Sequence, residues 1–449
     1  MSLIPDRAAA GPSFPLQGLS AASISKRLRE LQVALPTDEL GSLSMHCLAD
    51  SSHFMPEFRR IGDEAYASFG RLNAVFSPMV PAAGKIEDDV LDMCVEIFNG
   101  GKEGRCNITS GGTESIYCAM VAMREWAKAT RPRVQNPVVV APYTAHAAFS
   151  RAAHYFGFRL RRVAVGLDYR IRPADIEAAI CDATIGVIAS APNWPYGFVD
   201  PVSDIAGIAK TRGLWCHIDA CVGGYLAPFA RIAGYPLPPF DFAVPGVCSI
   251  SADLHKYAYV PKPCSTILWR SEEYQCYHYF IAADWPDGPY LAHSMLGSRP
   301  FGPIVAAWAI LNSLGERGFV ALARDIMESK AALVRGIAKI DGLHPWDNDL
   351  SLLVISGEGV DITAVASAMK MKGWALLGNQ EPPSIHLTID PLTPAAIDRF
   401  LTDLADATND VRSGRVAPRD VLAYGLAKEG QLPKWLVRGV ALATKLREP

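Results

Sequence analysis

The sequence predicts an α/β protein with a large, mostly parallel sheet and a smaller α/β domain towards the C-terminal end. Short, continuous apolar segments alternate with segments of helical period through the first two thirds of the chain. Continuous apolar runs indicate strands that are buried on both faces, as in a parallel sheet covered by helices. A long helical pattern then leads into a second, shorter alternation. We therefore expect an N-terminal segment, 1–60, a large domain, 61–315, and a small domain, 316–449.

The expected elements follow one another in a regular order. A helix at 20–31 begins with serines suited to capping, and a second amphipathic helix covers 85–98. The helices expected next lie at 113–129, 146–157, 173–181 and 202–213. The strands expected between and after them lie at 137–142, 159–165, 184–192, 214–220, from 249, and at 265–269. Such a sheet binds ligands at the carboxyl ends of its strands, so the residues at those ends are the candidates for function.

The C-terminal third repeats this alternation on a smaller scale. Residues 302–340 form a helical pattern longer than an ordinary element, broken by glycines, that could join two domains. The elements expected after it are strands at 350–356 and 382–389 and helices at 362–373 and 393–412. This pattern predicts the small α/β domain.

Composition favours a small-molecule enzyme of the cytoplasm. Among 449 residues, 43 basic and 46 acidic side chains give a net charge of −3, which provides no reason to expect nucleic acid or an anionic membrane as partner. The ten cysteines include no C-x-x-C pair, so we expect reduced thiols and no metal site. No segment approaches the roughly 18 to 20 apolar residues of a membrane span, and the N-terminus lacks the features of a signal peptide.

The segment NITSGGTESIYCAM, residues 107–120, contains a candidate phosphate site. Its small turn, which includes Gly112 and Thr113, comes directly before a helix of apolar period. The free N–H groups and the dipole at the start of such a helix favour an anion. An ordinary capped helix would have the same pattern, so both interpretations stay open from these residues alone.

Two further side chains stand at expected strand ends. His146 follows the strand at 137–142 and enters a helix, where it could stack on an aromatic ligand or cap the helix. Asp219 ends the strand at 214–220, and a buried carboxylate is costly unless it meets a cation or several donors. Its alternative role is a cap for the segment that follows.

The stretch SISADLHKYAYVPK, residues 249–262, places His255 and Lys256 at the end of an apolar run. The alternatives for this lysine are snorkelling and chemistry, because its ammonium is costly to bury. A desolvated lysine can form a Schiff base with an aldehyde. One cofactor requires a lysine, an acid, a phosphate cradle and often an aromatic ring together, namely pyridoxal 5'-phosphate. The joint occurrence of these groups therefore predicts that cofactor.

Several long motifs in register carry a family resemblance. TSGGTES, TAHAAF, HIDACVGG, SISADLHKY with PK, and GSRP occur in this order, with IFNGG before them and DPV, DW, KGW and PPSIH between or after them. The chain thus resembles the sphingosine-1-phosphate lyase branch of the pyridoxal-phosphate-dependent group II decarboxylases from about residue 18 to its end. The resemblance implies the aspartate aminotransferase fold (fold type I). It also implies retro-aldol cleavage of a 2-amino-3-hydroxy substrate to an aldehyde and an amine.

The resemblance assigns roles around the cofactor ring. Lys256 matches the lysine that holds the cofactor, and Asp219 matches the carboxylate that keeps the pyridine nitrogen protonated. His146 matches the histidine stacked on the ring, and His217 matches the histidine beside the cofactor. Lys256 is also a plausible proton carrier. Tyr257 and Tyr259 beside it could assist it or pack in the core.

The resemblance also implies a phosphate site and a dimer. Gly112, Thr113 and His255 match phosphate contacts. The site of this family is shared across a homodimer interface, where the GSRP loop reaches the pocket of the partner. Ser298 of this loop, and Ser294 before it, are small hydroxyl residues suited to a phosphate contact there.

Two other functions stay open. An amino-acid decarboxylase would use the same cofactor groups, and it would need a cation for the substrate carboxylate, for which Arg299 is the candidate. A catalytically silent cofactor-binding protein is the second alternative, although it would have no need of Lys256 and Asp219.

The sequence departs from the family where the substrate phosphate is recognised. A tyrosine of the family is absent from the stretch at 45–54, and Phe76 or Ser77 stands where the family has a histidine. Asn73 and Lys262 are retained. We therefore expect sphingosine-1-phosphate to be a poor substrate compared with one whose distal group is smaller or less charged.

Overall fold

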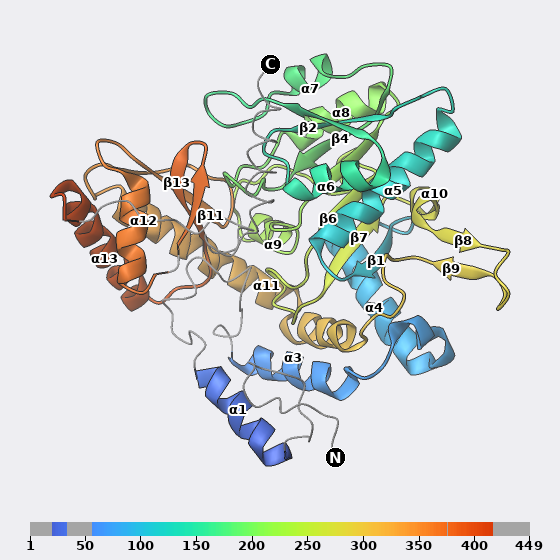
Figure 1. Ribbon diagram of the computed structural model, residues 1–449, viewed down its shortest axis with the longest axis horizontal. Coiled ribbons are helices and arrows are strands. Elements are labelled where there is room, and N and C mark those ends of the chain that lie inside the picture. The colour runs from blue at the N-terminus through green and yellow to red at the C-terminus, as the bar shows by residue number, and fades with distance from the viewer. Residues whose placement is uncertain (1–19, 34–55, 375, 416–449) are drawn as a thin grey trace, which may run out of the picture.

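The structure is a computed structural model that describes residues 20–33, 56–374 and 376–415. Its centre is a seven-stranded sheet, which confirms the large, mostly parallel sheet that the sequence predicts (Figure 1). The strands of this sheet are β1 Arg105–Thr109, β2 Val138–Pro142, β3 Arg159–Val163, β4 Thr184–Ser190, β5 Trp215–Asp219, β6 Ser249–Ala252 and β7 Ser265–Trp269. Strands β4 to β7 are buried along their whole length, because helices cover both faces of the sheet.

The strand order is β1-β7-β6-β5-β4-β2-β3. Strand β2 pairs in parallel with β3 and β4, and β4, β5 and β6 pair in parallel in turn. Strand β7 is antiparallel to both of its neighbours, β1 and β6. Every strand of this sheet except β7 therefore ends at the same edge.

Helices pack on both faces because successive strand residues point to opposite sides. The helices of this part of the chain, not all of which reach the sheet, are α1 Ala21–Val33, α3 Pro56–Phe69, α4 Pro81–Ile97, α5 Gly112–Thr130, α6 Ala147–Phe156, α7 Pro173–Ala178, α8 Val202–Thr211, α9 Ala227–Ile232 and α10 Glu272–Gln275, with 3₁₀ turns η1 Ala74–Met79 and η2 Cys276–His278. Val139 of β2 lies in one core with residues of α5 and α6. Its neighbour Val140 lies in the other core with residues of α8 and α9. The sheet is thus a covered, two-sided layer.

A smaller sheet confirms the predicted C-terminal α/β domain. Its four antiparallel strands have the order β10-β11-β13-β12. They are β10 Leu343–Pro345, β11 Leu352–Gly357, β12 Leu377–Gln380 and β13 Pro383–Thr388, and the helices of this part are α12 Ile362–Met371 and α13 Pro394–Arg412. Alternate residues of β13, such as Ile385 and Leu387, pack in one core with residues of α12 and α13.

The long helical pattern is helix α11, Gly302–Ile337, which the backbone interrupts at Gly315. Gly315 has a φ of 57°, in the left-handed region that glycine adopts without steric cost. Helix α11 contacts α3, α4 and α9 of the large domain as well as α13 and β10 of the small one. It thus connects the two parts, while the domain boundaries at residues 60 and 315 stay predictions.

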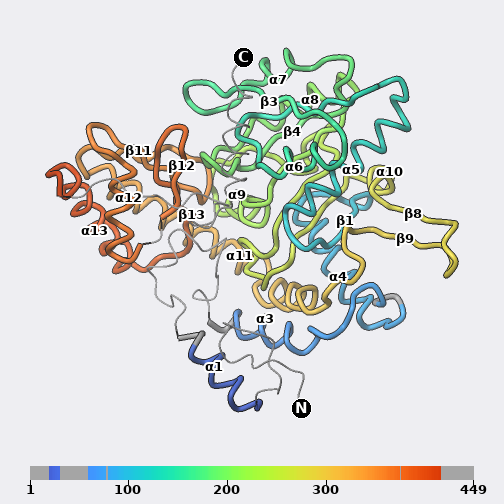
Figure 2. Tube along the Cα trace, in the orientation of Figure 1, coloured from blue at the N-terminus to red at the C-terminus, as the bar shows by residue number. Residues whose placement is uncertain are grey.

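A hairpin of β8 Phe280–Ala282 and β9 Tyr290–Ala292 projects from the large domain (Figures 1 and 2). The sequence did not predict this hairpin, because strands of three residues are too short for a periodic pattern. In the part of the chain that the structure describes, no helix combines the length and the apolar character needed to cross a membrane.

Candidate active site

A cavity of about 350 Å³ opens at the edge where the parallel strands end. Its walls come from the segments that follow β1, β2, β4, β5 and β6, as expected for an open α/β sheet. The predicted site residues among the lining side chains are Gly112, Thr113, His146, Asp219, His255 and Lys256. These residues lie up to 144 positions apart in the chain, and the fold brings them around one space.

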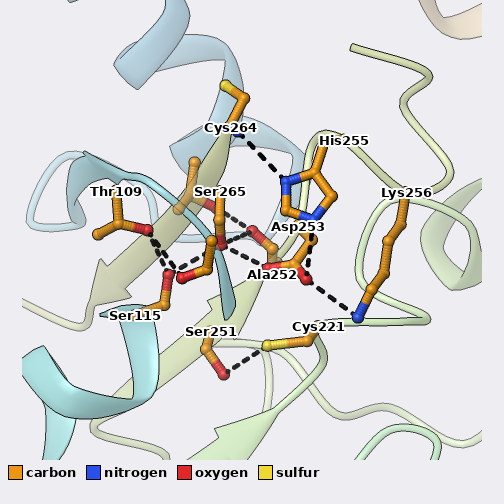
Figure 3. Close-up of polar contacts among 12 residues, drawn as sticks. Thr109, Ser115, Cys221, Ser251, Ala252, Asp253, His255, Lys256, Cys264 and Ser265 are labelled. Atoms are coloured by element: carbon orange, nitrogen blue, oxygen red, sulfur yellow. Dashed lines mark hydrogen bonds and ion pairs between the residues drawn. The ribbon is translucent and has the colours of Figure 1, made fainter. Parts of the chain in front are cut away.

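Lys256 lies just beyond the end of β6, and its amine points to a carboxylate that the sequence interpretation left without a role (Figure 3). The Nζ atom lies 3.0 Å from Oδ2 of Asp253, and the Lys256 side chain is 15% exposed. Snorkelling to solvent is therefore the wrong interpretation, since the amine faces a buried acid inside the cavity.

Asp219 is the last residue of β5 and has only 7% of its surface exposed. Its Oδ1 atom accepts a hydrogen bond from the backbone N–H of Cys221 at 3.1 Å and one from the Ser251 hydroxyl at 3.5 Å. The side chain thus caps the turn after β5 and also lines the cavity, so the two interpretations of this residue are compatible.

His217 lies behind Asp219, because residues two apart in a strand share a face. Trp215 Nε1 donates to the Ser249 hydroxyl, which lies 2.9 Å from His217 Nδ1. Because the Ser251 hydroxyl donates its proton to the Asp219 carboxylate, its oxygen can only accept from the His217 ring, which places the ring proton on Nε2 and leaves Nδ1 to accept from Ser249. Nε2 lies 3.3 Å from Ser251, whose hydroxyl donates to Asp219.

This chain of hydrogen bonds orients Asp219 through a neutral imidazole. Burial lowers the pKa of His217 to about 4. Within one protomer His217 does not line the cavity. Instead of lying beside the cofactor, as predicted, its side chain lies behind Asp219.

We expect the stability of the protein to fall as the pH drops below about 6.5, partly because of His217. The unfolded chain takes up this proton near pH 6.5, whereas the folded protein takes it up only near pH 4. Stability from this group is thus complete above the unfolded pKa and is lost in the window between the two values. Between pH 6.5 and 5 the loss is about 1.5 kcal/mol.

The measurement is the free energy of unfolding of the wild type and of His217→Asn over this range. The variant lacks the titrating group, so its free energy of unfolding should fall less steeply as the pH is lowered. Replacing the exposed His154 by Asn serves as the control and should keep the wild-type slope. A wild-type slope in His217→Asn would contradict the prediction.

His146 caps helix α6 and lines the cavity at the same time. Its Nδ1 atom accepts a hydrogen bond from the backbone N–H of Ala148 at 3.1 Å, which fixes the ring at the entrance of the helix. Burial lowers the pKa of His146, so the ring is neutral near pH 7. The capping and stacking interpretations are therefore compatible here as well.

The first turn of α5 forms part of the wall of the cavity. A Cβ atom at Gly112 would lie 2.7 Å from Cys221 Sγ and 2.9 Å from both carboxylate oxygens of Asp253, so only glycine allows this approach. The N–H groups of Gly112 and Thr113 belong to the helix start, where no helical carbonyl can accept them. These groups are available to an anion in the cavity.

His255 lies next to this turn, with its side chain 11% exposed. Its Nδ1 atom accepts from the backbone N–H of Cys264 at 3.2 Å, and its Nε2 atom lies 3.5 Å from Asp253 Oδ2. Burial lowers the pKa of His255, while Asp253 opposes this shift. Lys262, from the PK pair, lines the same cavity.

Pyridoxal phosphate fits this donor set. A helix start provides N–H groups for a phosphate, a strand-end carboxylate faces the cavity, a neutral histidine ring lines it, and one lysine amine points into it. In the described residues no cluster of three or more His, Cys, Asp or Glu side chains could hold a metal ion.

The GSRP loop lies apart from this cavity within one protomer. The Ser298 hydroxyl lies 3.3 Å from Asn73 Nδ2, and neither side chain lines the cavity. Ser294 donates its hydroxyl proton to the carbonyl of Leu296. The predicted phosphate contact of Ser298 can therefore not form inside its own protomer.

Arg299 of the same loop, the candidate for binding a substrate carboxylate, forms an ion pair within the protomer. Its Nη1 atom lies 2.8 Å from Glu87 Oε1, with side-chain exposures of 7% and 12%. Its backbone N–H donates to Asn73 Oδ1. Within the protomer, Glu87 holds this guanidinium outside the main cavity, so the hypothesis that it binds a substrate carboxylate stays a prediction.

Replacing Arg299 by Ala should therefore lower the free energy of unfolding. The variant removes the buried Arg299 guanidinium and its ion pair with the partly buried Glu87, which we expect to cost about 3 kcal/mol. Arg60→Ala removes an exposed ion pair with Glu64 and is the control, with an expected loss of about 0.5 kcal/mol. Chemical denaturation of both variants measures the difference, and equal losses would contradict the structural role.

Tyr257 and Tyr259 contact the small domain and do not line the cavity. The Tyr257 hydroxyl donates to the Ile389 carbonyl at 3.0 Å, and the Tyr259 hydroxyl donates to Asp390 at 2.9 Å. These bonds attach the loop that carries Lys256 to the segment after β13. Packing is therefore the role that the geometry favours for both tyrosines.

Among the lining residues that sequence reasoning missed are two acids, Asp253 and Glu114. Asp253 stands three positions before Lys256, and that spacing was the available signal. Glu114 Oε2 accepts from the backbone N–H of Ser110, and its Oε1 accepts from that of Met295, 181 positions away. No local pattern could have indicated the second contact.

Known proteins of one family are similar to this chain over most of its length. The family described as pyridoxal-dependent decarboxylase conserved domain matches residues 72–344. Sphingosine-1-phosphate lyase 1 of Mus musculus is 34% identical over 422 residues, which are 93% of this chain and 73% of that protein. L-aspartate/L-glutamate decarboxylase of Pyrococcus horikoshii is 30% identical over 345 residues, 76% of this chain and 88% of that protein. The solved sphingosine-1-phosphate lyase of Burkholderia pseudomallei is 30% identical with a TM-score of 0.86, covering 98% of this chain and 97% of that one.

Proposed function

Because the chain belongs to the pyridoxal-dependent decarboxylase family, in the branch of the sphingosine-1-phosphate lyases, we propose that it cleaves the Cα–Cβ bond of a 2-amino-3-hydroxy long-chain amine. The protein is a pyridoxal-phosphate-dependent lyase, and the products are an aldehyde and an amine. The observation that carries the proposal is the meeting of Lys256, Asp219, His146 and the start of α5 around one cavity.

The proposed roles follow from what each group faces. Lys256 would hold the cofactor covalently, and Asp219, oriented by Ser251, would hold a proton on the ring nitrogen. The ring of His146 would lie against the cofactor ring. When bound, pyridoxal phosphate supplies an aldehyde that joins an amine and a ring that takes up an electron pair from the substrate Cα.

The phosphate of the cofactor would lie at the first turn of α5. The N–H groups of Gly112 and Thr113 would bind this anion, and the helix dipole would favour it. His255 stands beside this turn and would contribute its ring. The proton that leaves the 3-hydroxyl of the substrate needs an acceptor, and the Lys256 amine is the proposed carrier.

The contacts of Arg299 favour the lyase over the decarboxylase. A decarboxylase would need a cation for the substrate carboxylate, and the candidate is held by Glu87 at 2.8 Å. The presence of both Lys256 and Asp219 in the cavity argues against a silent cofactor-binding protein.

We further propose that the active form is a homodimer. Exposed apolar side chains gather on the β8–β9 hairpin and on the segment before α4, namely Leu72, Val75, Phe76, Met79, Val80, Phe280, Ile281, Trp285 and Leu291. Asn73 and Pro300 form a β-bridge that joins this segment to the GSRP loop. An apolar surface of this kind marks an interface, and a partner there would place Ser298 near a second cavity. Sedimentation of the holoprotein tests this arrangement.

The decisive experiment detects the products by mass. The holoprotein is incubated with 2-amino-3-hydroxy amines and, separately, with amino acids. The proposal expects an aldehyde and an amine from the first set and no carbon dioxide from the second. Release of carbon dioxide without aldehyde would support the decarboxylase instead.

The substitutions near the predicted phosphate end of the substrate lead to a separate prediction. Phe76 is 56% exposed in the protomer and offers ring surface in place of a donor, whereas residues 45–54 lie outside the described part of the chain. Each lost charge-assisted bond costs roughly 1.5 to 3 kcal/mol. A phosphorylated long-chain base should therefore bind about a hundredfold or more weaker than in a typical member.

The measurement is kcat/KM for the phosphorylated and unphosphorylated forms of one long-chain 2-amino-3-hydroxy amine. We expect little preference for the phosphorylated form. A strong preference would mean that Lys262, which lines the cavity, or another group restores the phosphate site.

A further inference from the structure

Asp253 is the most buried acid that lines the cavity, and its carboxylate has three polar side-chain partners. The residue is 2% exposed. Its Oδ2 atom lies 3.0 Å from Lys256 Nζ and 3.5 Å from His255 Nε2. Its Oδ1 atom accepts a hydrogen bond of 2.5 Å from the Ser265 hydroxyl (Figure 3). A buried carboxylate of this kind is stable only because a cation and several donors surround it.

The contacts behind Asp253 extend into a chain of hydroxyl groups. Ser265 lies 2.8 Å from Ser115, and Ser115 lies 2.6 Å from Thr109, all of them buried. Because Ser265 gives its proton to Asp253, Ser115 must donate to Ser265 and Thr109 to Ser115. These dipoles all point towards the carboxylate, so the interior of the protein is arranged for a negative charge at this position.

The backbone prevents the carboxylate from moving away. Asp253 directly follows β6, and the turn after it closes through the bond from Lys256 N to the Asp253 carbonyl. The first turn of α5 presses on the carboxylate, since a Cβ at Gly112 would lie 2.9 Å from both oxygens. Burial raises the pKa of Asp253, but Lys256, His255 and the Ser265 hydroxyl together hold it below its usual value.

From these contacts we propose that Asp253 is a positioning residue for Lys256. In the cofactor-free site its carboxylate holds the Lys256 amine as an ammonium, and it binds the Lys256 amine again whenever the substrate amine displaces Lys256 from the cofactor. The inference rests on the role of Lys256 in the proposed function. Before the amine can attack an aldehyde it must lose one proton, and the carboxylate 3.0 Å away opposes that loss. Asp253 therefore sets the pH above which Lys256 becomes reactive.

Other ionisable groups share the cavity with this amine and must be kept constant in a test. They are Asp219, Glu114, His146, His255, Cys221 and Lys262, all of which line the cavity. A substitution that removes only the charge of Asp253 is needed, and asparagine has nearly the same shape.

The experiment follows covalent capture of pyridoxal, without its phosphate, by the apoprotein between pH 6 and 10. The Lys256 nitrogen bonds to the aldehyde carbon with loss of water, and borohydride then supplies hydride to reduce the carbon–nitrogen double bond. Peptide mass spectrometry locates the label. The rate should rise with pH around an inflection, and Asp253→Asn should lower that inflection by about one to three units.

Ser265→Ala is the matched control. It removes a neutral donor from the same carboxylate and leaves the charge opposite Lys256, so the inflection should stay within about 0.5 unit of wild type. Should Asp253→Asn not fold, as judged by its thermal unfolding, Asp253→Ser is the second neutral variant for the same comparison.

An unchanged inflection in the neutral variant would overturn the proposal. An equal shift in Ser265→Ala would overturn it too, because the cause would then be disturbance of the pocket and not the lost charge. A label found on another residue in the wild type would instead contradict the role of Lys256 in the proposed function. The two failures are thus distinguishable.

Discussion

Replacing Lys256 by Ala should abolish both covalent attachment of pyridoxal phosphate and all turnover. The Lys256 amine lies in the cavity and faces Asp253, whereas alanine has no nitrogen that could bond to the cofactor aldehyde. The purified variant should lack the visible absorbance of the covalently held cofactor, and borohydride should fix no label to it.

Lys262→Ala is the matched control, since this second lysine lines the same cavity. It should keep the absorbance and the borohydride-fixed label. If Lys256→Ala retained the label and Lys262→Ala lost it, the assignment of Lys256 would be wrong. Thermal unfolding of both variants shows whether either substitution disturbs the fold.

Replacing Asp219 by Asn should leave cofactor binding largely intact but lower the rate by several orders of magnitude. The amide oxygen can still accept the hydrogen bond from Cys221, so the turn after β5 should survive. A neutral amide cannot keep a proton on the ring nitrogen, and the ring then takes up electrons poorly. Cofactor content and single-turnover rates measure the two effects separately.

A buried aspartate away from the cavity is the control for this variant. Asp241 has no exposed surface and pairs with Arg231 at 2.5 Å. Asp241→Asn should lower stability and leave the turnover of the folded protein unchanged. Near-normal turnover in Asp219→Asn would mean that Asp219 is only a cap.

The contacts of Arg299 and Asp253 are features that the sequence interpretation did not predict. The motif GSRP placed Arg299 in a functional loop, yet its partner Glu87 lies 212 positions earlier in the chain. The motif SISADLHKY includes Asp253, but Ser265, which donates a hydrogen bond to the Asp253 carboxylate, lies on the next strand, β7. Local periodicity indicates neither the Arg299–Glu87 pair nor the Asp253–Ser265 hydrogen bond, because these partners meet only when separate segments pack together.

The sequence by itself determined the order of strands and helices in the large domain, the presence of a second α/β part, and the strand ends at which His146, Asp219 and Lys256 stand. These features are local, since the apolar period indicates the element and parallel strands share one functional edge. Only the tertiary structure decided that His217 acts from behind Asp219, that Arg299 is held by Glu87, and that an ionised Asp253 faces the amine. The physical reason is that charges and hydrogen bonds depend on distances of about 3 Å between side chains, and packing of remote segments sets those distances.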